Sequence, residues 1–94
     1  MKLGTFVVVR TYSAGVHVGT LSAQDGKNVT LTDARRVWRW HGANTLHELA
    51  NVGCDKVYSR ISDPVSSIDL TEAIELLACT DTARADLCHS RWGR

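Results

Sequence analysis

The strongest local structural signal in the chain is the stretch Val16-His-Val-Gly-Thr-Leu-Ser-Ala-Gln-Asp-Gly-Lys-Asn-Val-Thr-Leu-Thr-Asp33. At its centre, Asp25-Gly26 separates two segments in which successive residues suit opposite faces of a strand. Asp-Gly is favoured in two-residue type I′ turns, because both central positions of such a turn need a positive φ. The stretch therefore predicts a β-hairpin.

Further strand-like segments lie on both sides of this hairpin. Thr5–Tyr12 is rich in β-branched and aromatic residues and ends at the turn-forming Ser13-Ala-Gly15, which predicts a first strand and a first hairpin. After Asp33 the strand pattern continues into Arg35-Arg-Val-Trp-Arg-Trp-His41. A period of two places Arg35, Val37, Arg39 and His41 on one face and Arg36, Trp38 and Trp40 on the other. We expect Trp38 to lie in the core.

Two short helices are predicted from their capping residues. Thr45-Leu-His-Glu48 forms a capping-box pattern and Gly53 suits a helix stop, so a helix lies between them with Leu46, Leu49 and Ala50 facing inward. Thr80–Cys88 predicts a final helix capped by Thr80 or Asp81.

The region between the two helices is less clear. Lys56–Ile61 suits a strand, and Asp63-Pro64 interrupts the chain directly after it. Ile68–Cys79 fits both a helix and a buried strand, and we interpret it as strand.

These elements predict an α+β fold, with a mostly antiparallel β-sheet or a small barrel-like sheet and one or two short helices. The 94 residues, 44% of them hydrophobic, suit a single domain spanning residues 1–94, in which residues 90–94 form a flexible tail. A β-rich domain of this size has little core and leaves sheet edges uncovered, so we expect a homo-oligomer, most simply a dimer.

The balance of charge restricts the classes of partner. Eleven basic and ten acidic residues give a formal charge of +1, which creates no global field that attracts nucleic acid or an anionic membrane. No apolar run approaches the roughly 20 residues that span a bilayer, and no signal peptide is visible. We therefore expect a cytoplasmic protein without a membrane partner, and nucleic acid is a disfavoured ligand.

The sequence contains no recognisable catalytic or metal-binding motif. Cys54, Cys79 and Cys88 lack the spacing of a disulfide framework or a metal site, which predicts free and mostly buried thiols. A zinc site of Cys54, Cys88 and His89 is the alternative, although structural zinc normally takes four ligands. The histidines are scattered, and no nucleophile or acid–base signature is present. We predict a protein that is not an enzyme and needs no metal or cofactor.

Two segments resemble a known family: Arg10-Thr-Tyr-Ser-Ala-Gly-Val16 followed by Gly19, and Asp33-Ala-Arg-Arg-Val-Trp-Arg-Trp-His-Gly-Ala43 followed by Leu46 and Leu49-Ala50. With Leu70-Thr-Glu-Ala-Ile-Glu75 and Cys79-Thr80, they resemble small proteins of unknown function encoded by tailed phages and prophages. The chain departs from that pattern between Gly53 and Ser66. The resemblance implies a β-rich phage accessory protein in the host cytoplasm and supplies no catalytic residues.

The sharpest chemical feature is the combination of arginine and aromatic residues in the two segments that carry this resemblance. Guanidinium groups pair with phosphate, and aromatic rings stack on bases. The predicted ligand or partner surface consists of Arg10, Tyr12, Ser13, Arg35, Arg36, Arg39 and Trp40. The alternative is purely structural, with the tryptophans in the core and the arginines in solvent.

Two functions follow as hypotheses. The first is a phage accessory binding protein that antagonises host defence, either by sequestering a small nucleotide signal or by blocking a defence protein. The second is a structural or regulatory interaction module, such as a minor phage assembly factor, because Trp and Arg are also enriched at protein interfaces. Replacing Arg35 and Arg39 with Ala distinguishes the binding surface from a structural role. A binding surface predicts loss of activity with little loss of stability, and a structural role predicts full activity.

Overall fold

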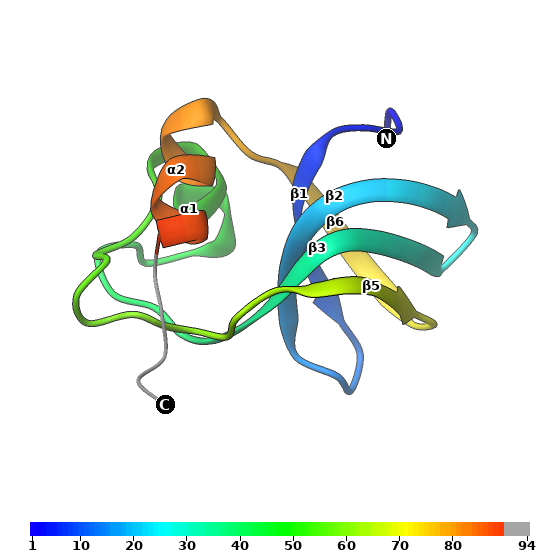
Figure 1. Cartoon of the computed structure of the whole chain (residues 1–94), viewed down its shortest axis with the longest axis horizontal. Coiled ribbons are helices and arrows are strands. Elements are labelled where there is room, and N and C mark those ends of the chain that lie inside the picture. Colours follow the sequence, from blue (N-terminus) through cyan, green and yellow to red (C-terminus); the bar gives the residue numbers. More distant parts are fainter. Residues whose placement is uncertain (90–94) are drawn as a thin grey trace.

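The computed structural model describes residues 1–89 as six antiparallel strands and two helices (Figure 1). The tail predicted at residues 90–94 lies outside the described residues. The elements are β1 (Phe6–Thr11), β2 (Val16–Asp25), β3 (Asn28–Arg39), α1 (Leu46–Val52), β4 (Arg60–Ile61), β5 (Val65–Leu70), β6 (Ala73–Ala78) and α2 (Asp81–His89). The predicted α+β class is confirmed, and the sheet is not closed.

The strands follow the order β4-β3-β2-β1-β6, and β5 pairs with β3 on the same side as β4. β5 and β6 are consecutive in the chain, yet they pair with different strands and so form opposite edges of the sheet. In Figure 1 the sheet curls, with β2, β3 and β5 in front of β1 and β6, and the two helices lie together at one end of the strands.

The hydrophobic residues form two cores, one on each face of the sheet. The helix-side core consists of Phe6, Val8, Val18, Val37, Leu49, Ala50, Cys54, Ile61 and Leu87. The sheet-interior core, which the curled sheet encloses, consists of Val7, Val9, Leu21, Val29, Leu31, Ala34, Leu70 and Ala73. Strand β1 supplies both, which explains why it is a continuous apolar run, since a strand buried on both faces cannot alternate.

A β-bulge between β2 and β3 helps the sheet to curl. Val18 pairs with Arg35 and Thr20 with Thr32, so β3 contains one additional residue at this point. Asp33, in the bulge, has a φ of 49° and is the one non-glycine residue with positive φ in the described chain. Gly19 lies opposite the bulge, where the two strands approach closely.

The β2–β3 hairpin is confirmed, but its turn differs from the predicted one. Asp25 pairs with Asn28, so the central residues are Gly26 and Lys27 instead of Asp25 and Gly26. Only the first of these has a positive φ, 60° at Gly26, which is the pattern of a type II′ turn. Glycine fits this position because it lacks the Cβ that makes positive φ costly.

The prediction that Trp38 lies in the core is wrong, because its side chain is 58% exposed. The physical reason is the choice of face: Val37 is buried in the helix-side core, and alternation places its neighbour Trp38 on the opposite, exposed face. A second bulge follows, because Val37 pairs with Ile61 but Arg39 pairs with Arg60, so β3 gains one residue between them. This shift breaks the period of two, and Trp40 packs against the helix-side core instead. The strict alternation predicted for residues 35–41 is therefore interrupted between Val37 and Arg39.

Both predicted helices are confirmed together with their caps. The Thr45 side chain accepts a hydrogen bond from the Glu48 amide at 3.2 Å, and the Gly53 amide donates to the Leu49 carbonyl at 3.1 Å. The Glu48 carboxylate accepts from the Asn44 amide at 3.2 Å, one residue before the position that a standard capping box uses. In α2 the cap is Thr80, whose hydroxyl accepts from the Ala83 amide at 3.1 Å.

The interpretation of residues 68–79 as strand is confirmed, although the region forms parts of two strands separated by Thr71-Glu72. Only Arg60–Ile61 of the predicted strand at 56–61 is extended. The Asp55 carboxylate accepts hydrogen bonds from the Val57 and Tyr58 amides, which holds a turn in the first part of that segment. Neither helix in the described chain has the length and apolar character that crossing a membrane requires.

The three cysteines are free, with Cys54 buried, Cys79 half-buried and Cys88 exposed. Burial raises the pKa of Cys79 to about 12, so its thiol stays protonated near neutral pH. No group of three or more metal-ligating side chains among residues 1–89 is placed to hold an ion, so the alternative zinc site of Cys54, Cys88 and His89 does not form.

Candidate functional site

The turn between β1 and β2 is fixed by its own hydrogen bonds. The Thr11 amide and hydroxyl both donate to the Gly15 carbonyl, at 3.0 and 2.8 Å, and the Ala14 amide donates to the Thr11 hydroxyl at 2.9 Å. Gly15 has a φ of 84°, which lets the turn close. The Tyr12 amide donates to the Glu72 carbonyl at 2.9 Å, so the turn is also attached to the β5–β6 connection. Its exposed residues are thus presented by a rigid backbone.

A cleft of about 460 Å³ lies between this turn and the segment that leads into α1. We call it the turn cleft, and its lining residues are Arg10, Thr11, Tyr12, Ser13, Gly15, Val16, Trp40, Asn44, Thr45 and Leu46. Four of the seven predicted site residues line it: Arg10, Tyr12, Ser13 and Trp40. Tyr12 is 77% exposed, whereas Trp40, Val16 and Leu46 pack against the helix-side core. The turn cleft therefore combines an apolar wall with polar groups at its rim.

An adjoining groove of about 380 Å³ lies on the other side of the turn. It shares Ser13, Gly15, Val16 and Trp40 with the turn cleft and adds Arg36 and the exposed Trp38. Arg36 is the fifth predicted site residue that the fold brings to this region. The turn is thus flanked by an arginine and an aromatic ring on each side.

Arg35 and Arg39, the remaining predicted site residues, line neither the turn cleft nor the adjoining groove. Arg35 is half-buried and its Nη1 donates to the Ser62 carbonyl at 3.4 Å. Arg39 is exposed and pairs with Arg60 of β4, on the far side of β3 from the turn. Trp40, the next residue, packs against the helix-side core, whereas Arg39 stays exposed beside the bulge in β3.

Arg10 is the cation of the turn cleft, and it already has a weak partner. Its Nη1 lies 3.7 Å from the Glu75 carboxylate, with side-chain exposures of 55% and 35%. An exposed ion pair of this kind contributes about 0–1 kcal/mol or less, because water screens it. An anionic ligand can therefore replace Glu75 as the partner of the Arg10 guanidinium at a small cost in free energy.

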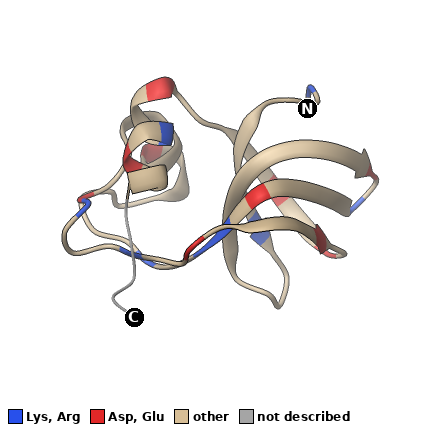
Figure 2. Ribbon diagram, in the orientation of Figure 1, with Lys and Arg blue, Asp and Glu red and all other residues tan. Residues whose placement is uncertain are grey.

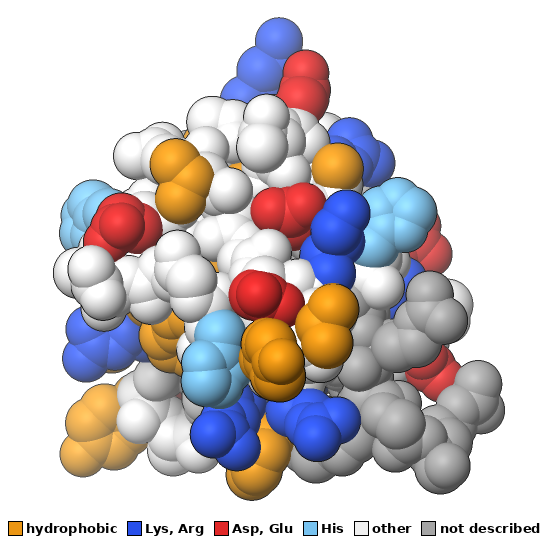
Figure 3. Space-filling view, turned by 90° about the vertical axis from the view of Figure 1, so that its left-hand side faces the viewer, with side chains coloured by type: hydrophobic (Ala, Val, Ile, Leu, Met, Phe, Trp, Pro, Cys, Tyr) orange, Lys and Arg blue, Asp and Glu red, His pale blue; other side chains and the backbone are white. Residues whose placement is uncertain are grey.

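The charges around the site are mixed. Figure 2 shows Lys and Arg interspersed with Asp and Glu along the strands and helices. Figure 3, which views the helix end, likewise shows both signs side by side and no large patch of one sign. The electrostatic attraction of an anion would therefore come from individual arginines at short range, since no extended positive surface is visible in these views.

His17 lies beneath the turn and supports it. The imidazole is 1% exposed, and its Nε2 lies 2.9 Å from the Ala14 carbonyl, so this nitrogen carries the donated proton. Burial lowers the pKa of His17 below its ordinary value of 6.5, and the charge of Arg36 lowers it further, against the opposing effect of the Ala14 hydrogen bond. A neutral His17 is therefore part of the folded turn.

We expect the protein to lose stability as the pH falls below about 6.5 because of His17. The pKa of His17 is lower in the folded state than in the unfolded state, so only the unfolded state takes up the proton at first. The contribution of neutral His17 to the free energy of unfolding is fully present above pH 6.5 and decreases as the pH falls toward the pKa of the folded state. Urea unfolding at about pH 7.5, 6.5 and 5.5 measures it. The His17→Gln variant should show a smaller loss over this range, and an equal loss in both proteins would contradict the assignment.

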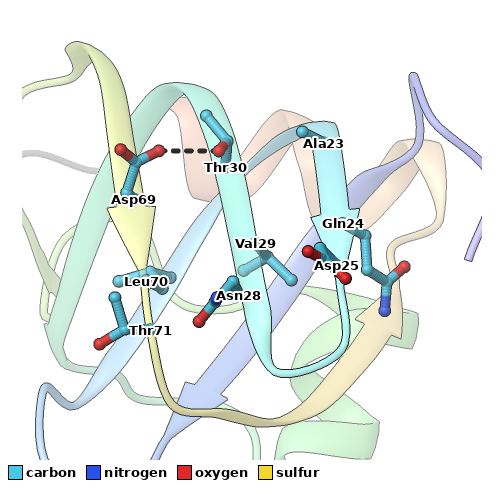
Figure 4. A pocket seen from close by; sticks show the side chains of 9 residues that line it. All are labelled: Ala23, Gln24, Asp25, Asn28, Val29, Thr30, Asp69, Leu70 and Thr71. Carbon is cyan, nitrogen blue, oxygen red and sulfur yellow. Dashed lines mark hydrogen bonds between the residues drawn. The ribbon is translucent and has the colours of Figure 1, made fainter.

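A separate polar pocket of about 350 Å³ lies between the β2–β3 hairpin and the end of β5 (Figure 4). There the Thr30 hydroxyl donates to the Asp69 carboxylate at 2.7 Å, above the apolar Val29 and Leu70. This pocket contains none of the predicted site residues. No motif in the sequence points to it, because its residues come from a hairpin and a strand 39 positions apart.

Sequence reasoning missed part of the turn cleft. Asn44, Thr45 and Leu46 form its second wall, although the sequence marks Thr45 and Leu46 only as helix-capping and core residues. Alternation assigns Trp38 to the core, whereas the structure shows an exposed ring beside the turn. Of Asn44, Thr45 and Leu46, the family resemblance includes only Leu46, which follows the segment that ends at Ala43.

The chain belongs to a family described as a domain of unknown function (DUF6948), whose model matches residues 4–87. The match contains all six strands, α1 and most of α2, so it covers the turn cleft completely. The resemblance to a family of unknown function is thereby confirmed. No curated protein and no solved structure matches the chain.

Proposed function

We propose that this protein is a non-enzymatic phage accessory protein that binds a small anionic ligand with a planar ring, of the nucleotide class, in the turn cleft. The observation that carries the proposal is the convergence of Arg10, Tyr12, Ser13 and Trp40, from two separate segments, on one cleft. These are four of the residues that sequence chemistry and the family resemblance together singled out.

The composition of the cleft suits such a ligand. Arg10 offers a forked donor for a phosphate, and Tyr12 and Trp40 offer ring surfaces for a base. The Ser13 hydroxyl can donate to a phosphate or accept from an amino group. A volume of about 460 Å³ falls within the range of small-molecule sites, roughly 300–1,000 Å³. The turn is also held by hydrogen bonds before any ligand arrives, which lowers the entropic cost of binding.

The biological role that we propose rests on the resemblance to proteins of tailed phages and prophages. A phage protein that binds a nucleotide signal without converting it would antagonise host defence by sequestration in the host cytoplasm. Such a role requires affinity for the nucleotide and no catalytic activity. Blocking a defence protein is the second form of the same proposal, with the exposed turn inserted into the partner.

The Arg10→Ala variant is expected to bind its nucleotide roughly 10- to 100-fold more weakly, because a hydrogen bond to a charged group contributes about 1.5–3 kcal/mol. Calorimetric titration with a panel of mono-, di- and cyclic nucleotides, and with nucleotides extracted from infected cells, identifies the ligand and measures the loss. Arg39→Ala is the matched control, since Arg39 is an exposed arginine outside the cleft.

Two results would count against the site. An equal loss of nucleotide affinity in Arg10→Ala and Arg39→Ala would mean that positive charge attracts the ligand in general, without a specific site in the turn cleft. Binding unchanged in the Arg10→Ala, Tyr12→Ala double variant would place the site elsewhere. If no nucleotide of the panel or the extract binds, the small-ligand form of the proposal fails.

An interaction module, such as a minor phage assembly factor, is the second candidate function. The exposure of Tyr12 and Trp38, 77% and 58%, favours it, because large aromatic rings at the surface are frequent anchors of protein interfaces. Trp38 distinguishes the two candidates, since it borders the groove but not the turn cleft. If Trp38→Ala abolishes activity during infection while Arg10→Ala leaves it intact, the interaction module is the correct interpretation.

A further inference from the structure

The two edges of the sheet are built differently. On the edge formed by β4 and β5, Asp63-Pro64 interrupts the strand, and β5 carries the exposed Ser66, Ser67 and Asp69. Proline and polar or charged residues are the usual devices that keep an edge strand from pairing with another chain. This edge is therefore protected.

The opposite edge, β6, carries no such protection. Its sequence Ala73-Ile-Glu-Leu-Leu-Ala78 contains no proline and no lysine, and its one charge, Glu75, is next to Arg10. Ile74 is 49% exposed, Ala78 is exposed, and Leu76 and Leu77 are half-buried. An apolar edge strand of this kind is a template for pairing.

The hydrogen bonds of β6 show which of its backbone groups are turned to the free edge. The Cys79 amide donates to the Phe6 carbonyl at 2.9 Å, and Leu77 and Glu75 occupy the equivalent positions opposite Val8 and Arg10. In an antiparallel pair the positions alternate, so the amides and carbonyls of Leu76 and Ala78 point away from β1.

A groove shared with α1 lies beside this edge. A groove of about 360 Å³ runs along Glu75–Ala78 and is bordered on its other side by His47, Ala50 and Asn51 of α1. A strand added to β6 would gain contacts from both β6 and α1.

We propose that β6 is a homodimer interface, in which β6 pairs antiparallel with β6 of a second copy. Leu76 of each copy lies opposite Ala78 of the other, and Leu77 lies opposite its own counterpart on the two-fold axis. This register pairs the outward amide and carbonyl groups of Leu76 and Ala78 in both copies, which gives four new backbone hydrogen bonds.

Charge argues against one alternative register, and burial agrees with the proposed one. A shift of two residues on each strand would set Glu75 opposite Glu75 of the other copy, and like charges directly opposite are destabilising. In the proposed register Glu75 faces Cys79 instead and keeps Arg10 as its partner. The half-buried Leu77 side chains meet at the axis, where they become covered. A second copy satisfies both conditions without any other protein.

The experiment is light scattering over a range of concentrations, combined with amide hydrogen exchange of the unmodified protein. We expect the mass of a dimer and protection of the Leu76 and Ala78 amides that appears only at concentrations where the dimer forms. The exchange measurement needs no variant, so it tests the edge even if a substitution impairs folding.

A pair of matched variants identifies the edge. Ala78→Lys and Ser66→Lys each add one positive charge at an exposed position, on β6 and on β5 respectively. We expect Ala78→Lys to raise the dimer dissociation constant at least tenfold and Ser66→Lys to leave it unchanged. A monomer at every concentration, a dimer with unprotected Leu76 and Ala78 amides, or a dimer weakened only by Ser66→Lys would each overturn the proposal.

Discussion

The Leu21→Ala variant is expected to lose about 2–5 kcal/mol of unfolding free energy, the range for removing a large aliphatic side chain from a core. Leu21 is fully buried in the sheet-interior core and pairs with Leu31 across the β2–β3 ladder. Domains are stable by about 5–15 kcal/mol in total, so the loss is a large fraction. Urea unfolding followed by circular dichroism measures it.

Trp38→Ala is the control, because it removes a larger side chain from an exposed position. At 58% exposure we expect a loss of about 1 kcal/mol or less. The sequence-based assignment of Trp38 to the core predicts about 3–5 kcal/mol instead, so the two variants test which face of β3 is buried. A larger loss for Trp38→Ala than for Leu21→Ala would show that the face of β3 that carries Trp38 is the buried one.

The sequence predicted the elements whose signals are local. The caps at Thr45 and Thr80 are formed within one helical turn, and the β2–β3 hairpin is closed by a glycine between alternating segments. These interactions involve residues a few positions apart, so neither sheet order nor packing decides them. The two-core arrangement could not be predicted in the same way, because the apolar run of β1 contains no information about which face packs against which partner.

The candidate site was predictable only in part. The predictable part again consists of residues that are close together in the chain. Arg10, Tyr12 and Ser13 are neighbours in the chain, so one turn keeps them together. Arg35, Arg36 and Arg39 are also neighbours, yet alternation places Arg35 and Arg36 on opposite faces, and the bulge after Val37 changes the surroundings of Arg39. A bulge adds one residue to one strand relative to its partner, and that mismatch exists only in the pairing. A single strand's sequence therefore could not place Arg39 and Trp40.

Gly19→Val is expected to lower the free energy of unfolding by about 1–3 kcal/mol, the cost of forcing additional atoms into a packed site. A Cβ on residue 19 would lie 3.0 Å from the Thr32 carbonyl oxygen, 3.1 Å from the Leu31 Cβ and 3.2 Å from the Ala34 Cα. These three atoms belong to the backbone of β3 or are bonded directly to it. They cannot move without shifting the strand, so the bulge at Asp33 would have to open.

Gly15→Val separates this steric effect from backbone strain. Gly15 has a φ of 84° and open space within 4 Å of the point where a Cβ would lie, whereas Gly19 does not have a positive φ and is crowded. Asn tolerates positive φ better than Val, so Gly15→Asn should recover much of the stability lost in Gly15→Val. No such recovery is expected at Gly19, because Asn carries the same Cβ into the same contacts. Equal recovery at both glycines would contradict the close approach of β2 and β3 as the reason for a glycine at position 19. Gly19 follows the first family-like segment, and Asp33, at the bulge opposite it, begins the second.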